Sequence, residues 1–190
     1  MADINLFWPI LKSNEGGYTV DSGGETYLGI SRKYHPEWKG WPLVDQAKEA
    51  YGFGTGPIDT WKEQVAFTHV IWGRQDITDL ALQFYKPDFW DIFQADHITN
   101  QSIANFIVDW GVNCGDIVVK KVQALLGVTA DGIFGSGSLS ALNAQSNLEF
   151  FQTLVKARLA YYQHTAEMKP SEAKYLTTWT NRTNSFSFQA

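Results

Sequence analysis

The sequence predicts a mainly α-helical protein with one small β-hairpin close to its N-terminus. Apolar residues recur at helical spacing along most of the 190 residues, and five glycines within residues 14–31 indicate the hairpin. A composition of 44% hydrophobic and 18% charged residues is typical of a globular chain. This length allows one sizeable core or two small domains that share an interface.

The first helix is expected to end at Glu15. An apolar run leads into this position, and Gly16 and Gly17 can adopt the backbone conformations that stop a helix. Asp21 follows six residues later, and Gly23 and Gly24 let the chain fold back toward Glu15. Two carboxylates on opposite sides of a groove are what cleavage of a glycosidic bond commonly needs. The alternative is a solvated Glu15 beside an ordinary hairpin.

The middle of the chain predicts several short helices. Ser31 can cap a helix that ends at Pro36, a break is expected at residues 40–42, and a helix is expected over residues 44–51. A further helix is indicated by apolar spacing, and its apolar side chains are expected in the core rather than in a site. These residues are Trp61, Val65, Thr68 and Trp72. Pro87 is expected to kink or end the helix that carries Tyr85.

The second half of the chain is helical by the same criterion. Residues 100–114 have one apolar face, residues 118–126 form an amphipathic helix that ends at Gly127, and residues 148–162 predict a long helix. A last helix follows Pro170. Cys114 is expected as a small core residue at a helix end.

Composition and motif spacing exclude several functions. The net charge of -5 and the lack of a Lys/Arg cluster argue against nucleic acid, and no apolar run approaches the ~20 residues of a membrane span. The histidines form no His-x-x-x-His motif, so we expect no metal and no cofactor. Cys114 is the single cysteine, which rules out an intramolecular disulfide.

Three motifs near the N-terminus resemble the opening signature of the glycoside hydrolase 108 lysozyme family, some members of which are labelled secretion activators. The chain departs from the family pattern at Ser22, where the family has proline, and in a shorter loop between Tyr18 and Asp21. The motifs are Glu15-Gly16-Gly17-Tyr18, Asp21-Ser22-Gly23-Gly24-Glu25-Thr26 and Gly29-Ile30-Ser31.

Motifs after residue 120 resemble the peptidoglycan-binding helical module that is fused to these lysozymes. Ala157-Arg158 and Trp179-x-x-Arg182 also resemble the family, and Asp131 is expected to have a structural role in orienting two helices. The module motifs are Val122-Gln123, Leu126-Gly127, Asp131-Gly132-Ile133-Phe134-Gly135 and Leu139-Ser140-Ala141-Leu142.

The resemblance implies a lysozyme-like fold with a small β-hairpin after the catalytic glutamate, packed against a C-terminal helical module. Residues 1–95 would form the catalytic region and residues 96–190 the peptidoglycan-binding region. The implied activity is that of a muramidase, which hydrolyses the β-1,4 bond between N-acetylmuramic acid and N-acetylglucosamine. The partner would be the peptidoglycan glycan strand.

The resemblance also implies the site residues. Glu15 would be the general acid, and Tyr18, Tyr85, Trp90 and Asn113 would contact the substrate. Aromatic faces stack well on sugar rings, but Tyr85 and Trp90 fit plain core packing too, and Asn113 fits a helix-terminal role.

Burial among apolar neighbours would raise the pKa of Glu15 and keep it protonated. Asp21 would stay ionised, with Thr26 helping to hold a water for inversion, whereas direct attack by Asp21 would give retention. Glu25 is the reserve second carboxylate. If neither acid faces Glu15, a lytic transglycosylase becomes the alternative.

A second class of function is a non-catalytic wall-binding or secretion-assisting protein, which the shortened loop favours. The N-terminus does not read as a signal peptide, so synthesis in the cytoplasm and action at the cell wall or periplasm are expected. Export would then require a partner such as a holin or a secretion machinery.

Overall fold

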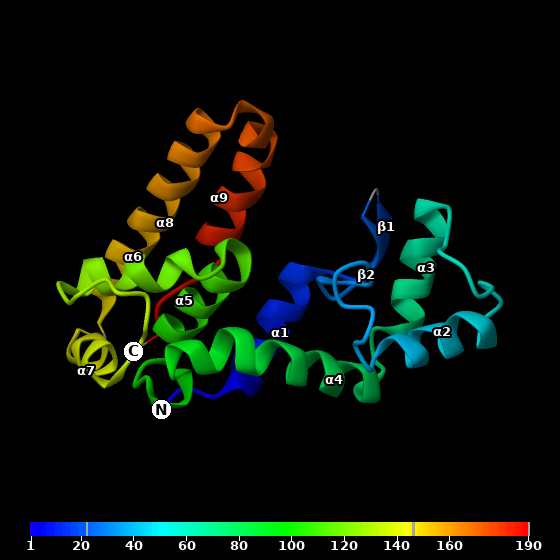
Figure 1. Ribbon diagram of the computed structural model, residues 1–190, viewed down its shortest axis with the longest axis horizontal. Coiled ribbons are helices and arrows are strands. Elements are labelled where there is room, and N and C mark those ends of the chain that lie inside the picture. The colour runs from blue at the N-terminus through cyan, green and yellow to red at the C-terminus, as the bar shows by residue number, and fades with distance from the viewer. Residues whose placement is uncertain (22, 146, 190) are drawn as a thin grey trace. The chain divides into compact units, whose positions relative to one another are not determined.

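The computed structural model describes residues 1–21, 23–145 and 147–189 (Figure 1). Ser22, at which the sequence departs from the family pattern, lies outside the described residues. The chain divides into two compact units, residues 8–87 and residues 1–7 with 88–190, and each is described by itself. No helix within the described ranges has the length and apolarity needed to span a membrane.

The unit of residues 8–87 combines helices with a three-stranded antiparallel sheet of order β1-β2-β3. Its helices are α1 (Ile4–Glu15, of which the first residues belong to the other unit), α2 (Trp41–Ala50), α3 (Trp61–Ile71) and α4 (Gln75–Tyr85). Its strands are β1 (Tyr18–Asp21), β2 (Gly24–Tyr27) and β3 (Ile30–Ser31).

Two expectations for the segment after β3 are wrong. Ser31 caps no helix, because it pairs with Thr26 as the last residue of β3, and successive turns follow it. Helix α2 begins at Trp41, inside the segment expected to be a break. Pro42 is compatible with this start because the first turn of a helix leaves its backbone N–H groups without partners inside the helix.

Helix α3 covers the free edge of β1 through two side chains. The backbone N–H of Tyr18 donates to the Thr68 hydroxyl at 2.9 Å, and that of Val20 donates to the Gln64 side-chain oxygen at 3.3 Å. Gln64 and Thr68 are one helical turn apart, and their two partners are alternate residues of the strand. The edge strand therefore has its outward N–H groups satisfied, and α3 is held in register with β1.

In its described part, the unit of residues 1–7 and 88–190 is built from helices joined by turns and loops, with no strand. Helix α4 of the other unit ends at Tyr85, as Pro87 predicts. A π-helical turn (Lys86–Trp90) then leads into this unit. The remaining helices are α5 (Gln101–Cys114), α6 (Ile117–Leu126), α7 (Ser136–Ala144), α8 (Leu148–Met168) and α9 (Leu176–Asn184). Short 3-10 turns cover Asp91–Phe93, Ala95–His97 and Pro170–Tyr175.

Helix α5 forms the centre of this second unit. Residues 102–111 of α5 are all buried, and α8 and α9 lie side by side in opposite directions (Figure 1). The fully buried Asp109 carboxylate binds Arg158 of α8 at 2.8 Å and Arg182 of α9 at 2.7 Å. This arrangement explains why the two arginine motifs occur far apart in the sequence: both guanidinium groups pair with one carboxylate.

Asp131 has the structural role that the sequence predicts. Its carboxylate accepts hydrogen bonds from the Ile133 backbone N–H at 2.9 Å and from the Gln123 side chain at 2.8 Å, and both lower the pKa of Asp131. The Gln123 side-chain oxygen in turn accepts from the Gly132 backbone N–H. The Asp-Gly turn is thus tied to α6 by polar contacts.

Candidate active site

Glu15 lies at the C-terminal end of α1 and is half-buried. The helix stops there because Gly16 has φ +79, a conformation that favours glycine, while its N–H still donates to the Lys12 carbonyl at 3.1 Å. A packed helix thus holds the backbone of Glu15 while its side chain reaches the surface. The predicted helix end at Glu15 is confirmed.

The Glu15 carboxylate lies against the turn between β2 and β3. Leu28 and Gly29 form this two-residue turn, with φ of 50 and 76, and positive values at both positions are typical of the type I′ turn. A Cβ on Gly29 would lie less than 3.0 Å from both the Glu15 carboxylate and the Tyr85 hydroxyl. Gly29 of the Gly-Ile-Ser motif therefore leaves space for the Glu15 carboxylate.

Tyr85 fixes this turn from α4. Its hydroxyl donates to the Leu28 carbonyl at 2.8 Å, and its ring is 5% exposed. The hydrogen bond holds a leucine whose positive φ is unfavourable for a residue with a Cβ. Tyr85 of α4, Gly29 of the β2–β3 turn and Glu15 of α1 thus lie close together.

The two faces of the β1–β2 hairpin have different chemistry. Thr19 pairs with Thr26 and Asp21 pairs with Gly24, so Thr19, Thr26 and Asp21 share one face because side chains alternate along a strand. Thr19 and Asp21 are exposed, and Thr26 is half-buried. This face is polar and open to a ligand, and it carries two of the predicted catalytic residues.

Glu25 belongs to the opposite, buried face of the hairpin. Its carboxylate binds the buried Lys48 at 2.5 Å, Arg32 at 3.2 Å and the Tyr18 hydroxyl at 2.6 Å. These three partners hold the Glu25 carboxylate in the interior of this unit. The pleat of the sheet and these ion pairs favour Asp21 over Glu25 as the second acid.

Tyr18 lies beneath the sheet rather than in the open face. Its ring is 2% exposed and packs edge-on against Phe67 at 5.1 Å. Burial, and next to it the hydrogen bond to Glu25, raise the pKa of the Tyr18 hydroxyl. In this position Tyr18 holds the Glu25 carboxylate and offers no open ring face for stacking.

Trp90 and Asn113 belong to the unit of residues 1–7 and 88–190. Trp90 is 1% exposed, stacks on Phe7 at 5.7 Å, and donates its indole N–H to Asp96 at 2.7 Å. Asn113 is half-buried and accepts a hydrogen bond from the Tyr162 hydroxyl. The buried rings of Tyr85 and Trp90 agree with the packing alternative, and a contact of either ring with saccharide stays a prediction.

Cys114 ends α5, as the sequence predicts, and is half-buried. Burial raises the pKa of its thiol, which keeps the sulfur protonated and unreactive at neutral pH. Within the part of the chain that the structure describes, no group of three His, Cys, Asp or Glu side chains converges as a metal site would require.

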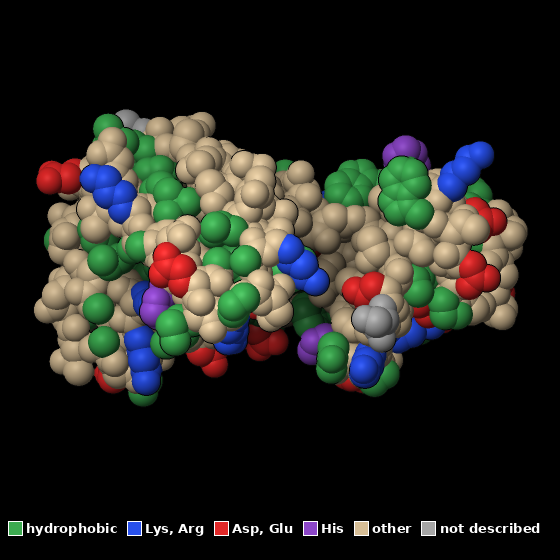
Figure 2. Space-filling model, turned by 90° about the horizontal axis from the view of Figure 1, so that it is seen from above, with side chains coloured by type: hydrophobic (Ala, Val, Ile, Leu, Met, Phe, Trp, Pro, Cys, Tyr) green, Lys and Arg blue, Asp and Glu red, His purple; other side chains and the backbone are tan. Residues whose placement is uncertain are grey.

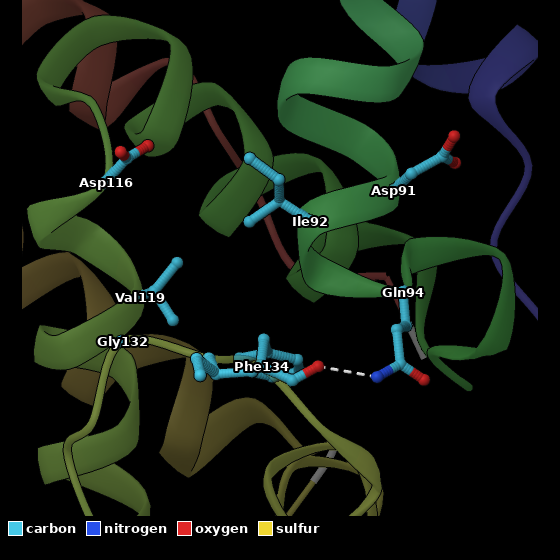
Figure 3. Close-up of a pocket in the computed structure, with 8 residues that line it drawn as sticks. Asp91, Ile92, Gln94, Asp116, Val119, Gly132 and Phe134 are labelled. Atoms are coloured by element: carbon cyan, nitrogen blue, oxygen red, sulfur yellow. Dashed lines mark hydrogen bonds between the residues drawn. The ribbon is translucent and has the colours of Figure 1, made fainter.

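The unit of residues 1–7 and 88–190 contains an apolar hollow of about 390 Å³. Figure 3 shows Ile92, Val119 and Phe134 around it, with the Asp91 carboxylate turned away. The Gln94 side chain donates to the Phe134 carbonyl at 2.5 Å and borders the hollow. Phe134 comes from the module motif, so the Asp-Gly turn of the module forms one wall of this hollow.

Two models of known families match this chain. A model described as glycosyl hydrolase 108 matches residues 8–115. The chain belongs to the glycosyl hydrolase 108 family. A second model, described as a predicted peptidoglycan domain, matches residues 118–184. The resemblance drawn from the sequence motifs is confirmed, and the second model matches the region where the motifs of the helical module occur.

A solved structure shows the same fold. It is described as the structure of Brucella abortus SagA, is 22% identical, and covers 99% of this chain and 99% of that chain with a TM-score of 0.56. A search of curated proteins gives no match. The predicted mainly α, lysozyme-like fold of this glycosyl hydrolase 108 member is therefore confirmed.

Three features of the structure do not follow from the sequence. The Gly-Ile-Ser motif singles out Gly29, but it does not show that Glu15 and Tyr85 are the residues that lie against it. The pairing of Asp109 with two arginines was signalled only by isolated arginine motifs. The expectation that Trp61, Val65, Thr68 and Trp72 lie in the core is wrong, because Trp61 is 77% exposed and the buried residues of α3 are Gln64, Phe67 and Ile71. Helical spacing does not show which face of a helix packs against the core.

Proposed function

We propose that this chain is a muramidase that hydrolyses the β-1,4 bond between N-acetylmuramic acid and N-acetylglucosamine in peptidoglycan. The observation that carries the proposal is the position of Glu15. Glu15 is the last residue of a packed helix, and its carboxylate lies next to the exposed Gly29 and the Tyr85 hydroxyl. The family, whose members act on glycosidic bonds, and the peptidoglycan domain model support the substrate class.

In this mechanism Glu15 donates a proton to the glycosidic oxygen as the bond to the sugar breaks. Asp21 is the second carboxylate, on the polar face of the hairpin, and Thr26 on the same face helps to hold the attacking water. General acid catalysis of this kind contributes about 10²–10⁴-fold to the rate. Water attack assisted by Asp21 would invert the anomeric centre, and direct attack by Asp21 would retain it.

We assign catalysis to residues 1–95 and peptidoglycan binding to residues 96–190. Because both functions act on the same polymer, the cell wall is the proposed site of action. The export partner, a holin or a secretion machinery, stays a prediction.

The proposal is tested by the loss of turbidity of purified peptidoglycan with wild type, Glu15→Gln and Glu49→Gln. Glu49 is an exposed residue of α2 and serves as the matched control. We expect clearing by wild type and Glu49→Gln, and a rate lowered by about 10²–10⁴-fold in Glu15→Gln. Equal clearing by Glu15→Gln would contradict the role of Glu15.

Two other outcomes identify the alternatives. No clearing by wild type, with peptidoglycan still retained in a pull-down, would show a non-catalytic binding protein. Products with an anhydro sugar end would show a lytic transglycosylase, in which the hydroxyl of the sugar attacks in place of water. The anomeric form of freshly released sugar then decides between inversion and retention.

A further inference from the structure

Large hydrophobic side chains are exposed at several places on the surface of the protein (Figure 2). Trp61, in the first turn of α3, is 77% exposed. A tryptophan in this position contributes little to the core, because most of its apolar area stays in water. The exposed ring is therefore available to bind a ligand.

Trp61 borders a hollow of about 190 Å³ between β1 and α3, which we name the β1–α3 hollow. Trp61, Val65 and Thr68 lie on one face of α3 because they are four and three residues apart. The side chains of Gln64 and Thr68 hold the backbone of β1 at its wall. The lining residues include Gly17, Thr19, Trp61, Gln64, Val65 and Thr68.

The hollow and the hairpin face with the proposed catalytic groups share a residue of β1. Thr19 lines the hollow and also shares the exposed hairpin face with Asp21 and Thr26. Gly17, two residues after Glu15, lines it as well, and a Cβ there would collide with the Thr68 side chain. The hollow and the polar face are thus adjacent parts of one surface.

The chemistry of the hollow fits a sugar ring. The exposed Trp61 borders the hollow, and so do the polar residues Thr19, Gln64 and Thr68. Pyranose rings present C–H groups on their faces and hydroxyl groups at their edges, so a ring stacked on Trp61 keeps its edge toward a polar wall. Aromatic residues bind well where one side of the ligand is apolar and the other is wet.

We propose that the β1–α3 hollow is a saccharide subsite in which Trp61 stacks on a pyranose ring of the glycan strand, next to the bond that is cleaved. This inference rests on the proposed function for the identity of the glycan. It differs in substance from the predicted contacts of Tyr18, Tyr85 and Trp90, whose rings are buried. Trp61 supplies the stacking surface in their place.

The test measures binding of soluble peptidoglycan glycan fragments to full-length protein that carries Glu15→Gln, so that binding is separated from turnover. Trp61→Ala and Trp61→Phe are compared with Tyr51→Ala. Tyr51 is 61% exposed, lies directly after α2, and is the matched control. We expect Kd to rise about five- to tenfold in Trp61→Ala, less in Trp61→Phe, and not in Tyr51→Ala.

Kinetics of the same variants with an intact Glu15 give the second readout. Trp61→Ala should raise KM by the same factor as Kd and leave kcat close to wild type, because stacking beside the cleaved bond is uniform binding. Equal Kd values for Trp61→Ala and Tyr51→Ala would overturn the subsite. So would a change of oligomeric state in Trp61→Ala with glycan binding unchanged, which would make Trp61 a self-association contact.

The two proposals fail separately. If Glu15→Gln protein still cleaves peptidoglycan, the catalytic role of Glu15 is wrong, and the Kd comparison still decides the role of Trp61. If Trp61→Ala binds glycan as well as the control while Glu15→Gln is inactive, the muramidase proposal stands and the subsite is wrong.

Discussion

At the scale of single residues, the turn of Leu28 and Gly29 connects packing to the proposed chemistry. Leu28 is fully buried and has a positive φ, which costs about 1–2 kcal/mol for a residue with a Cβ. The Tyr85 hydroxyl binds its carbonyl at 2.8 Å and compensates part of this cost. The turn thereby presents Gly29, which has no side chain, to the Glu15 carboxylate.

Gly29→Ala is expected to lower activity much more than stability. The added Cβ would lie too close to the Glu15 carboxylate and the Tyr85 hydroxyl, so both groups would have to shift from their present positions. A displacement of about 1 Å at a catalytic group can cost about 10²-fold in rate. The measurement is kcat on peptidoglycan, together with the free energy of unfolding from denaturant titration.

Gly52→Ala is the matched control for this variant. Gly52 has φ +79 against +76 for Gly29, but a Cβ at Gly52 meets no atom within 4 Å. Both variants should lose about 1 kcal/mol of stability from the positive φ, and only Gly29→Ala should lose activity. Equal activity in the two variants would show that the contact of Gly29 with Glu15 has no catalytic consequence.

At the scale of elements, one buried carboxylate joins three helices. Asp109 of α5 pairs with Arg158 of α8 and Arg182 of α9, and Asp109 and Arg158 are fully buried. The Arg158 guanidinium also lies over the Phe106 ring at 5.3 Å. A buried ion pair gains little over a well-packed apolar contact, but removing one partner leaves the others as uncompensated buried charges.

Asp109→Asn is therefore expected to lower the free energy of unfolding by about 3–5 kcal/mol. The control is Asp76→Asn, which breaks the exposed pair of Asp76 with Arg74 at 2.6 Å. Exposed pairs contribute about 0–1 kcal/mol because water and salt screen them. Denaturant titration of both variants measures the difference. A similar small loss in both would mean that the Asp109 network is not needed to hold α8 and α9.

At the scale of the whole molecule, the boundary of the family models does not coincide with a boundary of the structure. The glycosyl hydrolase 108 model ends at residue 115 and the peptidoglycan model begins at residue 118. Helix α5 falls within the first model, yet its Asp109 binds two arginines that fall within the second. The region matched by the first model is thus completed by residues of the second.

A fragment of residues 1–115 should consequently lack an ordered α5. In the fragment, α5 would expose the apolar face that α6 and α8 cover, and Asp109 would lose both arginines. We expect limited proteolysis to cut residues 88–115 rapidly in the fragment and slowly in the full chain, because local opening exposes the backbone to cleavage. Equal protection of α5 in both would show that the first region folds without the second.

The sequence by itself determined the helical class, the end of α1 at Glu15, the hairpin and the family. These features depend on local physics: apolar periodicity, glycine conformations and short motifs whose residues are close in the chain. The tertiary structure decided which polar groups pair. It placed Glu25 in buried ion pairs, Asp21 on the open face, and Asp109 between two distant arginines.

The same division explains the aromatic residues. Spacing indicates that Tyr85, Trp90 and Trp61 belong to helical segments, but it does not indicate which ring is covered. Covering depends on neighbours that are distant in the chain, such as Phe7 for Trp90 and the β2–β3 turn for Tyr85. Only the folded chain brings these neighbours into contact, and it leaves Trp61 exposed beside the edge of β1.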